Sequence, residues 1–274
     1  MNRGLNVLSL FDGMSCGQIA LEKSGIKVKK YYASEIDKHA IKVTQKNYPN
    51  TTQLGDVTSW KNWDLPKIDL LLAGSPCQGF SFAGKKLNFN DPRSKLFFTF
   101  VDILKNVKPK YFLLENVIMD DKHSDTITNI LGVKPVKINS SLVSAQNRSR
   151  LYWTNIKNIK QIEDKGLTIA DIYQPGTGNP LSSKTSSRPR TLRNLRGHDE
   201  KAFCMTATMY KLSQSNGMTV IQDGDYMRCV TPTECELLQT VPVGYTAHVS
   251  NTQRYKMLGN GWTVDVISHI LKGI

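Results

Sequence analysis

The chain has 274 residues, five cysteines and a formal charge of +13, from 36 lysines and arginines against 23 aspartates and glutamates. No apolar run approaches the roughly 18 residues of a membrane helix, and no charged start followed by an apolar stretch marks a secretory leader. We therefore expect a protein that is not exported and has no membrane span. The cysteines form no Cys-x-x-Cys pair, which argues against a zinc site or a disulfide framework and suits a reducing cytosol.

The positive charge favours a polyanionic partner, with nucleic acid ahead of an acidic membrane surface. On charge alone, a lysine-rich composition without such a partner is an equally good interpretation. A more specific signal is the segment 176–198, which has no acidic residue and carries Lys184, Arg188, Arg190, Arg193 and Arg196.

Short apolar runs alternate with helical segments over the first 155 residues, which indicates an α/β fold with a mostly parallel sheet and flanking helices. The pattern predicts strands at residues 6–11, 30–36, 68–74, 111–117 and 136–143, and helices at residues 15–25, 94–107, 231–241 and 262–273. The helix from 231 has a clear start, because Thr231 can cap it, Pro232 suits the first helical position and Glu234 can complete a capping box.

The regular pattern loosens near residue 155, and the stretch 174–227 is the least regular part of the chain. We expect two domains. Residues 1–155 form the first, completed by 255–274, because the last helix must pack on something. Residues 156–254 form a smaller, loop-rich second domain with its supporting helix.

The strand 6–11 runs into the turn "LFDGMSCG" and then a helix, an arrangement that can hold an anionic or carboxylate-bearing ligand. Glu35 ends the next strand at about the distance where α/β cofactor folds hold ribose hydroxyls, and Asp56 could accept from an adenine amino group. Each acid can equally be a turn or helix cap. The turn lacks the spacing of a dinucleotide fingerprint or a P-loop, so a nucleoside cofactor without a pyrophosphate fits better.

The aliphatic strand 68–74 ends in "GSPCQGFS", where Pro76 fixes the backbone ahead of Cys77. Ligands of open parallel sheets bind beyond the carboxyl ends of the strands, so this thiol is a candidate nucleophile. An isolated cysteine is more often a buried apolar filler. The polar, basic loop 78–95 that follows can close over a substrate.

Glu115, in "LLEN", supplies a carboxyl at the end of the next strand that could stay protonated and share a proton with a ring nitrogen. Arg148 and Arg150 are two residues apart, so both point to one side of an extended segment. Beside a thiol, two guanidinium groups favour the thiolate and can hold a carbonyl oxygen or a phosphate. A solvated basic strand is the plainer interpretation.

Six motifs follow one another along the chain: FDGMSCG, GSPCQGFS, RSKLFF, LLENV, QNRSR and LGNGWTVDV. With them the chain resembles the DNA cytosine C5 methyltransferases of bacteria and phages. The resemblance implies a Rossmann-like catalytic and cofactor-binding domain with a smaller target-recognition domain. It also implies that Cys77 attacks C6 of cytosine, that Glu115 contacts N3 and the exocyclic amine, and that Arg150 holds the base carbonyl with assistance from Arg148.

The resemblance further implies S-adenosyl-L-methionine as methyl donor and S-adenosyl-L-homocysteine as product. The cofactor-binding residues would be Phe11, Asp12, Gly13, Met14, Gly17, Glu35, Ile36, Asp56, Val57, Pro76, Leu96, Asn260 and Gly261. Family members often carry Ser or Ala where Gly261 stands, so a side-chain contact at that position is not carried over.

Double-stranded DNA would be the substrate, with the target cytosine swung out of the stack. A cognate restriction endonuclease would be a partner, and the enzyme would act as a monomer in a bacterial cytoplasm. Contacts to DNA phosphates and base edges would come from Gln78, Ser81, Lys85, Arg188, Arg190, Arg193, Arg196, Thr206 and Arg228.

Two other functions stay open. One is methylation of transfer RNA by the same family, although that branch usually carries a Cys-Phe-Thr tripeptide that this chain lacks. The other is a DNA-binding protein that has kept the fold and lost catalysis, against which stand Cys77, Glu115, Arg148 and Arg150. A zinc-dependent cytosine deaminase is excluded, because its Cys-x-x-Cys ligand pair is absent.

Overall fold

The computed structural model describes residues 4–75, 92–212 and 217–274, in a chain that divides into two compact units. Unit 1 comprises Met1–Ile138, Ser149–Lys160 and Ser268–Ile274, and unit 2 comprises Asn139–Arg148 and Gln161–Ile267. The segments 139–148 and 255–267 thus fall in unit 2, whereas the expected division put them with the first domain. The assignment of catalysis and target recognition to separate domains stays a prediction. Within the described ranges, no helix is long and apolar enough to span a membrane.

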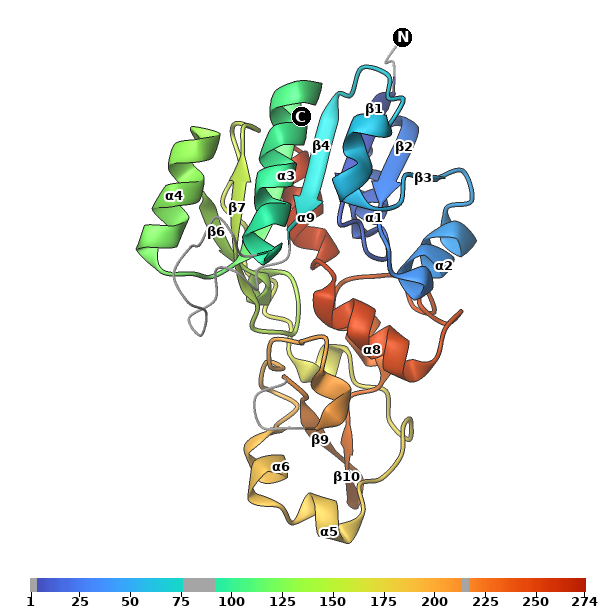
Figure 1. The fold of residues 1–274 in the computed structure, drawn as a ribbon. Helices are drawn as coiled ribbons and strands as arrows, with labels where there is room; N and C mark the ends of the chain where they lie inside the picture. The colour runs from blue at the N-terminus through green and yellow to red at the C-terminus, as the bar shows by residue number, and fades with distance from the viewer. Residues whose placement is uncertain (1–3, 76–91, 213–216) are drawn as a thin grey trace. The chain divides into compact units, whose positions relative to one another are not determined.

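A seven-stranded sheet runs through the described part of unit 1, in the order β3-β2-β1-β4-β5-β7-β6 (Figure 1). Its strands are β1 Leu5–Leu10, β2 Val28–Ser34, β3 Thr52–Gln53, β4 Leu70–Gly74, β5 Tyr111–Val117, β6 Val136–Asn139 and β7 Ser149–Thr154. The first five are parallel to their neighbours and β7 is antiparallel to β5. The strand order reverses between β1 and β4, which is where open sheets of this kind bind ligands.

Helices connect these strands and cover the sheet. They are α1 Cys16–Lys23, α2 Lys38–Asn47, α3 Pro92–Val107 and α4 Asp121–Leu131, with the 3₁₀ helix η1 Val57–Asn62. The last helix, α9 Val264–Leu271, ends in unit 1, where Ser24 Oγ after α1 donates to the carbonyl oxygen of Ser268 at 3.0 Å. The end of the chain therefore packs on the first helix, as expected for its final residues.

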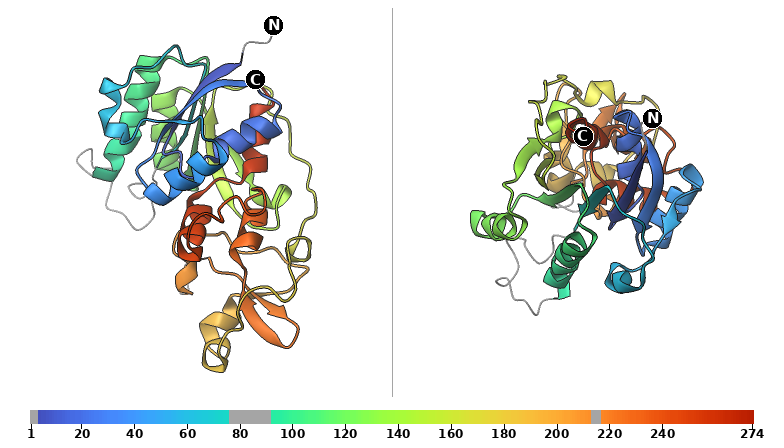
Figure 2. Two further views of the ribbon diagram at one scale, coloured as in Figure 1. Left: turned by 90° about the vertical axis from the view of Figure 1, so that its right-hand side faces the viewer. Right: turned by 90° about the horizontal axis from the view of Figure 1, so that it is seen from above.

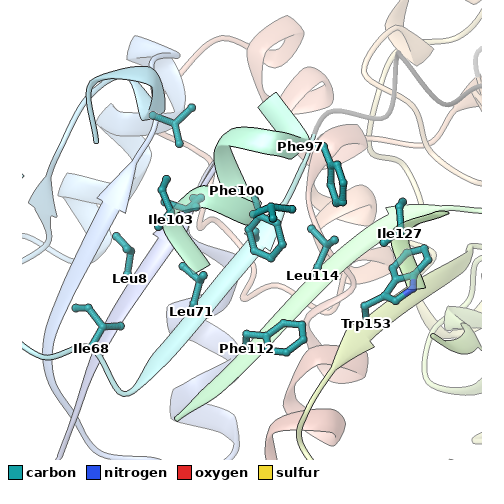
Figure 3. Packing of buried hydrophobic residues seen from close by; sticks show 14 of the residues in the cluster. Leu8, Ile68, Leu71, Phe97, Phe100, Ile103, Phe112, Leu114, Ile127 and Trp153 are labelled. Atoms are coloured by element: carbon teal, nitrogen blue, oxygen red, sulfur yellow. The ribbon is translucent and has the colours of Figure 1, made fainter. Parts of the chain in front are cut away.

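One face of the sheet packs against α3 and α4 (Figure 3). Alternate strand residues point to this face, as the two-residue period of a strand requires: Leu8, Leu71, Leu114 and Trp153. Over them lie aromatic and aliphatic side chains of the two helices, namely Phe97, Phe100, Ile103 and Ile127. Figure 2 shows α1 on the opposite face. This core fixes the neighbouring strands whose ends carry the candidate site.

Unit 2 contains a three-stranded sheet in the order β10-β9-β8, from β8 Leu195–Arg196, β9 Val220–Asp223 and β10 Tyr226–Cys229. Gly224, with φ +58°, makes the turn of the antiparallel β9-β10 hairpin, a backbone conformation that glycine adopts without steric cost. The helices of the unit are α5 Ser183–Ser186, α6 Pro189–Arg193, α7 Pro232–Leu238 and α8 Asn251–Asn260, with the 3₁₀ helices η2 Ser140–Leu142, η3 Ile169–Asp171 and η4 Met209–Lys211.

The predicted α/β class is confirmed, and so is the start of α7, where Thr231 and Glu234 form the capping box. The strand expected at 136–143 is wrong beyond residue 139. There the side chain of Asn139 accepts from the backbone N–H of Ser141, which favours the 3₁₀ helix η2. The sheet instead gains β7, an antiparallel strand that begins at Ser149.

Candidate active site

The candidate site lies along the carboxyl edge of the parallel strands in unit 1, where hydrogen bonds join the ends of neighbouring strands. After β1 and β2, the backbone N–H of Gly13 donates to Glu35 Oε2 at 2.8 Å. After β4 and near the end of β5, Asn116 Nδ2 donates to Ser75 Oγ at 3.2 Å. Two of the expected cofactor residues, Gly13 and Glu35, therefore meet after β1 and β2, and Glu115 is the neighbour of Asn116 on β5.

The turn after β1 is held in a tight conformation. Phe11, Gly13 and Ser15 have φ values of 57°, 60° and 65°, a region that costs a residue other than glycine about 1–2 kcal/mol. Ser15 precedes α1 without capping it, because its hydroxyl donates to the carboxylate of Asp12. The first backbone amides of α1 thus have no side-chain cap from Ser15, which suits a carboxylate-bearing ligand.

Asp12 anchors this turn through two hydroxyl groups. It accepts from Ser15 Oγ and, at 2.7 Å, from the hydroxyl of Tyr31. Burial raises the pKa of Asp12 to about 6, and the nearby carboxylate of Glu35 adds to this rise, against the lowering effect of the hydrogen bonds. Asp12 therefore braces the cofactor turn from within and changes charge close to neutral pH.

Glu35 accepts three backbone hydrogen bonds. Oε2 accepts from Gly13, and Oε1 accepts from Ile36 and Asp37, each at 2.8 Å. A carboxylate oxygen has two lone pairs, so Oε2 has acceptor capacity left for a ribose hydroxyl. The neighbouring Ile36 is 74% exposed, a large apolar side chain beside a polar edge. Together they suit the ribose and adenine of S-adenosylmethionine.

Asp56 caps η1 by accepting from the backbone N–H and the hydroxyl of Thr58 at 2.8 and 2.9 Å, both at Oδ1. These bonds lower the pKa of Asp56. The cap that the sequence offered as the plain alternative is therefore present, while Oδ2 stays compatible with an adenine amino group. Val57, the next residue, is buried in the core.

The other expected cofactor residues vary in exposure. Met14 and Gly17 are buried, whereas Leu96 on α3 packs partly against the core. In unit 2, Asn260 is exposed at the end of α8, and Gly261 follows in extended conformation. Five expected site residues lie outside the described residues: Pro76, Cys77, Gln78, Ser81 and Lys85.

Glu115 and Arg150 form an ion pair in unit 1, with Nε of Arg150 3.0 Å from Oε1 of Glu115. Glu115 lies opposite Tyr152 on the antiparallel neighbour β7, and Arg150 lies two residues before Tyr152 on the same side of the sheet. The side chains are only 12% and 13% exposed. The structure thus brings together the two groups expected to hold a cytosine ring.

The structure places Arg148 among carbonyl groups of unit 2. Arg148 is 3% exposed, and its terminal nitrogens donate to the carbonyl oxygens of Met205, Gly259 and Gly261 in unit 2. Residue 148 also precedes the first residue of β7, so the alternation of an extended strand does not govern it. In this conformation its guanidinium is engaged within unit 2, and its assistance to Arg150 stays a prediction.

Arg228, expected to contact DNA, is also enclosed within unit 2, and its contact with DNA stays a prediction. Arg228 is fully buried, with Nε 2.5 Å from Asp223 Oδ2 and its other nitrogens bonded to Glu234 at 2.8 and 2.9 Å. Such a guanidinium has no surface for a DNA phosphate. Hydrogen bonds from Tyr173 and then Arg228 lower the pKa of Asp223 to about 2, which keeps the cluster charged.

The remaining basic candidates of unit 2 differ from one another. Arg196 lies with Cζ 3.8 Å from the ring centroid of Phe203 and is 28% exposed. Arg188, Arg190 and Arg193 are exposed at the start of α6 and along it. Thr206 is partly buried in the segment before η4. The exposed arginines of α6 are therefore the better candidates for contacts to DNA.

Sequence reasoning missed a buried polar network in unit 2. Gln146 Nε2 donates to Gln239 Oε1 at 3.0 Å, and the hydroxyl of Thr263 donates to the same oxygen at 2.8 Å. Gln239 Nε2 donates to the carbonyl oxygens of Leu258 and Gly261. The only signal was a set of polar residues within apolar segments, which does not identify partners about 90 residues apart.

Comparison with known proteins agrees with the expected family. The family model of C-5 cytosine-specific DNA methylase matches residues 5–201 and 137–274. The chain is 31% identical to the Type II methyltransferase M1.ScrFI of Lactococcus lactis subsp. cremoris, over 96% of this chain and 76% of that protein. It is 30% identical to the Type II methyltransferase M.NlaX of Neisseria lactamica, over 96% of this chain and 94% of that protein.

Among solved structures, the Dnmt2 methyltransferase of S. pombe has a TM-score of 0.81 at 20% sequence identity, over 98% of this chain and 97% of that one. This likeness confirms the expected α/β fold with a mostly parallel sheet and flanking helices. The match of the family model extends over almost the whole chain, and the two curated relatives match over nearly all of it. The chain therefore belongs to the family of C-5 cytosine-specific DNA methylases, for which S-adenosylmethionine is the methyl donor.

Proposed function

We propose that this protein methylates C5 of a flipped-out cytosine in a short duplex DNA sequence, through a covalent bond between Cys77 and C6 of the base. The observation that carries this proposal is the ion pair between Glu115 and Arg150 at the end of β5. The neighbouring strand β4 leads directly into the segment with Cys77. In the sequence the nucleophile thus follows β4, while Glu115 lies near the carboxyl end of the adjacent β5 and Arg150 near the amino end of β7.

The roles follow from the chemistry of the ring. Cys77 is the nucleophile, because a thiolate is strongly nucleophilic near neutral pH. As its sulfur bonds to C6, electron density passes to C5, while Glu115 holds N3 and the amino group and Arg150 holds the carbonyl oxygen. S-adenosylmethionine supplies the methyl group to C5 and is converted to S-adenosylhomocysteine. A base then removes the C5 proton, the electrons reform the double bond, and the sulfur of Cys77 leaves C6.

The cofactor contacts proposed here use the turn after β1 and the acid after β2. Glu35 has acceptor capacity for ribose hydroxyls, and Ile36 offers an apolar surface to adenine. The start of α1 can receive the carboxylate of the methionine part. Support for this arrangement comes from the start of α1, where the side chain of Ser15 makes no cap, and from the turn that Asp12 holds by hydrogen bonds.

DNA contacts in this proposal come from unit 2, chiefly from Arg188, Arg190 and Arg193. Their exposure and the lack of acidic residues in 176–198 support the assignment of a target-recognition role to this segment. The curated relatives M1.ScrFI and M.NlaX are named Type II methyltransferases, so we propose that a cognate restriction endonuclease accompanies this enzyme. We further propose that it acts as a monomer in a bacterial cytoplasm.

The test is to incubate the purified protein with labelled S-adenosylmethionine and unmethylated genomic DNA, and to sequence the product for methylated cytosine. Methyl groups at C5 in one repeated sequence context support the function and reveal the target. Transfer to RNA alone would instead favour an RNA substrate. Cys77→Ser should bind DNA and transfer no methyl group; retained activity in that variant would remove Cys77 from the mechanism.

A further inference from the structure

The segment 204–207 of unit 2, which carries Thr206, is held between two glycines with no room for a side chain. A Cβ atom on Gly259 would lie 2.2 Å from the carbonyl carbon and oxygen of Thr206. A Cβ atom on Gly217 would lie 2.0 Å from the carbonyl oxygen of Cys204. These distances are far below van der Waals contact, so the backbone of this segment packs directly on the end of α8.

Arg148 bridges the same two parts of the chain with its guanidinium group. NH1 donates to the carbonyl oxygen of Met205 at 2.9 Å, and to Sγ of Cys204 at 3.5 Å. NH2 donates to the carbonyl oxygens of Gly261 at 2.9 Å and Gly259 at 3.3 Å. The four N–H groups on these two nitrogens therefore all have partners, half on the segment 204–207 and half on the turn 259–261.

The bridge itself is firmly supported. The backbone N–H of Arg148 donates to Asn139 Oδ1 at 2.9 Å, and the carbonyl oxygen of Gly261 also accepts from Gln239 Nε2 at 3.0 Å. Hydrogen bonds from a charged donor in a buried site are stronger than neutral ones and hold their geometry. A displacement of the turn 259–261 is therefore transmitted to Met205 and its neighbours through one rigid side chain.

We propose that Arg148 is a positioning residue that couples cofactor binding at the turn 259–261 to DNA binding at the segment 204–207. The inference rests on the proposed function, together with the sequence-based expectation that Asn260 and Gly261 meet the cofactor and that Thr206 meets the DNA. Cofactor binding fixes the position of the turn, and Arg148 transmits that position to the segment that DNA contacts. DNA then binds to a prearranged segment, and by linkage the reverse also holds.

The test compares the affinity for DNA with and without S-adenosylhomocysteine. The protein is titrated into a fluorescein-labelled duplex that contains the target sequence found for the wild type. Fluorescence anisotropy gives the Kd in both conditions. We expect saturating S-adenosylhomocysteine to tighten wild-type binding by about 5-fold or more, the usual lower range of allosteric coupling. Arg148→Met should bring this ratio close to 1. Arg148→Lys should lower this ratio in part, because a single ammonium group cannot bond to the carbonyl groups of both segments as the planar guanidinium group does.

Arg254→Met is the matched control. Arg254 is also a largely buried arginine of unit 2, and it donates to Thr246 Oγ1 at 2.9 Å and to Glu236 Oε1 at 3.1 Å. It has no hydrogen bond to the segment 204–207 or the turn 259–261 among the bonds of the described residues. Its loss should lower the melting temperature and leave the affinity ratio unchanged. If Arg148 had only a structural role, Arg148→Met would likewise lower the melting temperature and leave the affinity ratio unchanged.

The inference is overturned if Arg148→Met keeps the wild-type ratio within about 2-fold, or if Arg254→Met lowers the ratio as much. It is also overturned if the wild type methylates DNA but shows no effect of S-adenosylhomocysteine on its affinity. Should Arg148→Met fail to melt cooperatively, Arg148→Lys decides: a ratio below that of the wild type supports the inference, and a ratio equal to it within experimental error overturns it. A wild type that methylates no DNA overturns the proposed function, and this inference with it.

Discussion

Arg150 holds Glu115 by its Nε atom, 3.0 Å from Oε1, across the one antiparallel strand pair established by register in the described part of the large sheet. In the sequence, the candidate nucleophile follows β4, which is parallel to β5. Strand β7 is antiparallel to β5, so its amino end lies beside the carboxyl end of β5. Because β7 runs in the opposite direction, Arg150 near its amino end lies at this edge of the sheet. The topology thus explains why the two groups meet although they are 35 residues apart.

Glu115→Gln should reduce the rate of methyl transfer by about 10²-fold or more, because the variant keeps the shape of the side chain but cannot share a proton with the ring. Single-turnover transfer from labelled S-adenosylmethionine to DNA measures this rate. The matched control is Asp125→Asn, which neutralises an exposed carboxylate on α4 and should transfer at the wild-type rate. A wild-type rate in Glu115→Gln would contradict the proposed role.

The pKa of Asp12 predicts a pH dependence of stability. Because burial raises this pKa from 3.8 to about 6, the folded state binds the proton more tightly than the unfolded state. The stabilisation is complete below about pH 4 and is lost as the pH rises through 6. Asp12 is partly exposed, so we expect less than the roughly 3 kcal/mol that such a shift implies.

Asp12→Asn should remove this contribution, so the difference in unfolding free energy between wild type and variant should change between pH 4 and 6 and be constant above. Urea unfolding at several pH values measures it. Asp56→Asn serves as a control of opposite sign, because hydrogen bonds lower the pKa of Asp56 and its stabilisation disappears as the pH falls. A constant difference for Asp12→Asn would show that the carboxyl does not titrate in this range.

Local patterns predicted much of the fold. The strand 68–74 was predictable because Leu70, Leu71 and Leu72 form a continuous apolar run, and all three are fully buried. Likewise the helix start at Thr231 follows from residues within four positions. The direction and partner of β7 could not be predicted, because periodicity identifies an extended segment but not the strand it pairs with.

The arginines likewise show that sequence patterns do not identify long-range contact partners. Arg148 takes carbonyl partners that are 57 to 113 residues away, and no sequence pattern identifies a backbone carbonyl. Glu234 was predicted as a capping residue, and it does accept from the N–H of Thr231. Its carboxylate also binds Arg228, a second contact that the capping pattern does not reveal. Long-range burial, rather than motif spacing, therefore separates structural arginines from exposed ones.

Arg228→Met should destabilise unit 2 strongly. Removing one partner of a buried ion pair leaves an uncompensated charge, here on Glu234, at a typical cost of about 3–5 kcal/mol. Hydrogen exchange should show lost protection in β9 and β10, with the strands of unit 1 less affected. Arg190→Met, on the exposed side of α6, should change stability by less than about 0.5 kcal/mol. Equal effects of both variants would contradict the structural role of Arg228.

Arg190→Ala should weaken DNA binding without weakening the fold, because Arg190 is exposed on α6 in a segment without acidic residues. If Arg190 meets a phosphate, affinity falls about equally for all sequences, and the slope of log K against log salt decreases by about 1. If it meets a guanine edge, the loss is confined to the target sequence. Titrations of target and non-target duplexes at several salt concentrations separate these cases.

Arg196→Ala is the internal comparison for that experiment. Its guanidinium lies over the ring of Phe203 and is 3.9 Å from Glu200, so part of its charge is already engaged within unit 2. We therefore expect a smaller change in the salt slope than for Arg190→Ala. The opposite order, with Arg196 as the stronger contributor, would mean that the DNA-facing surface lies near β8 rather than on α6.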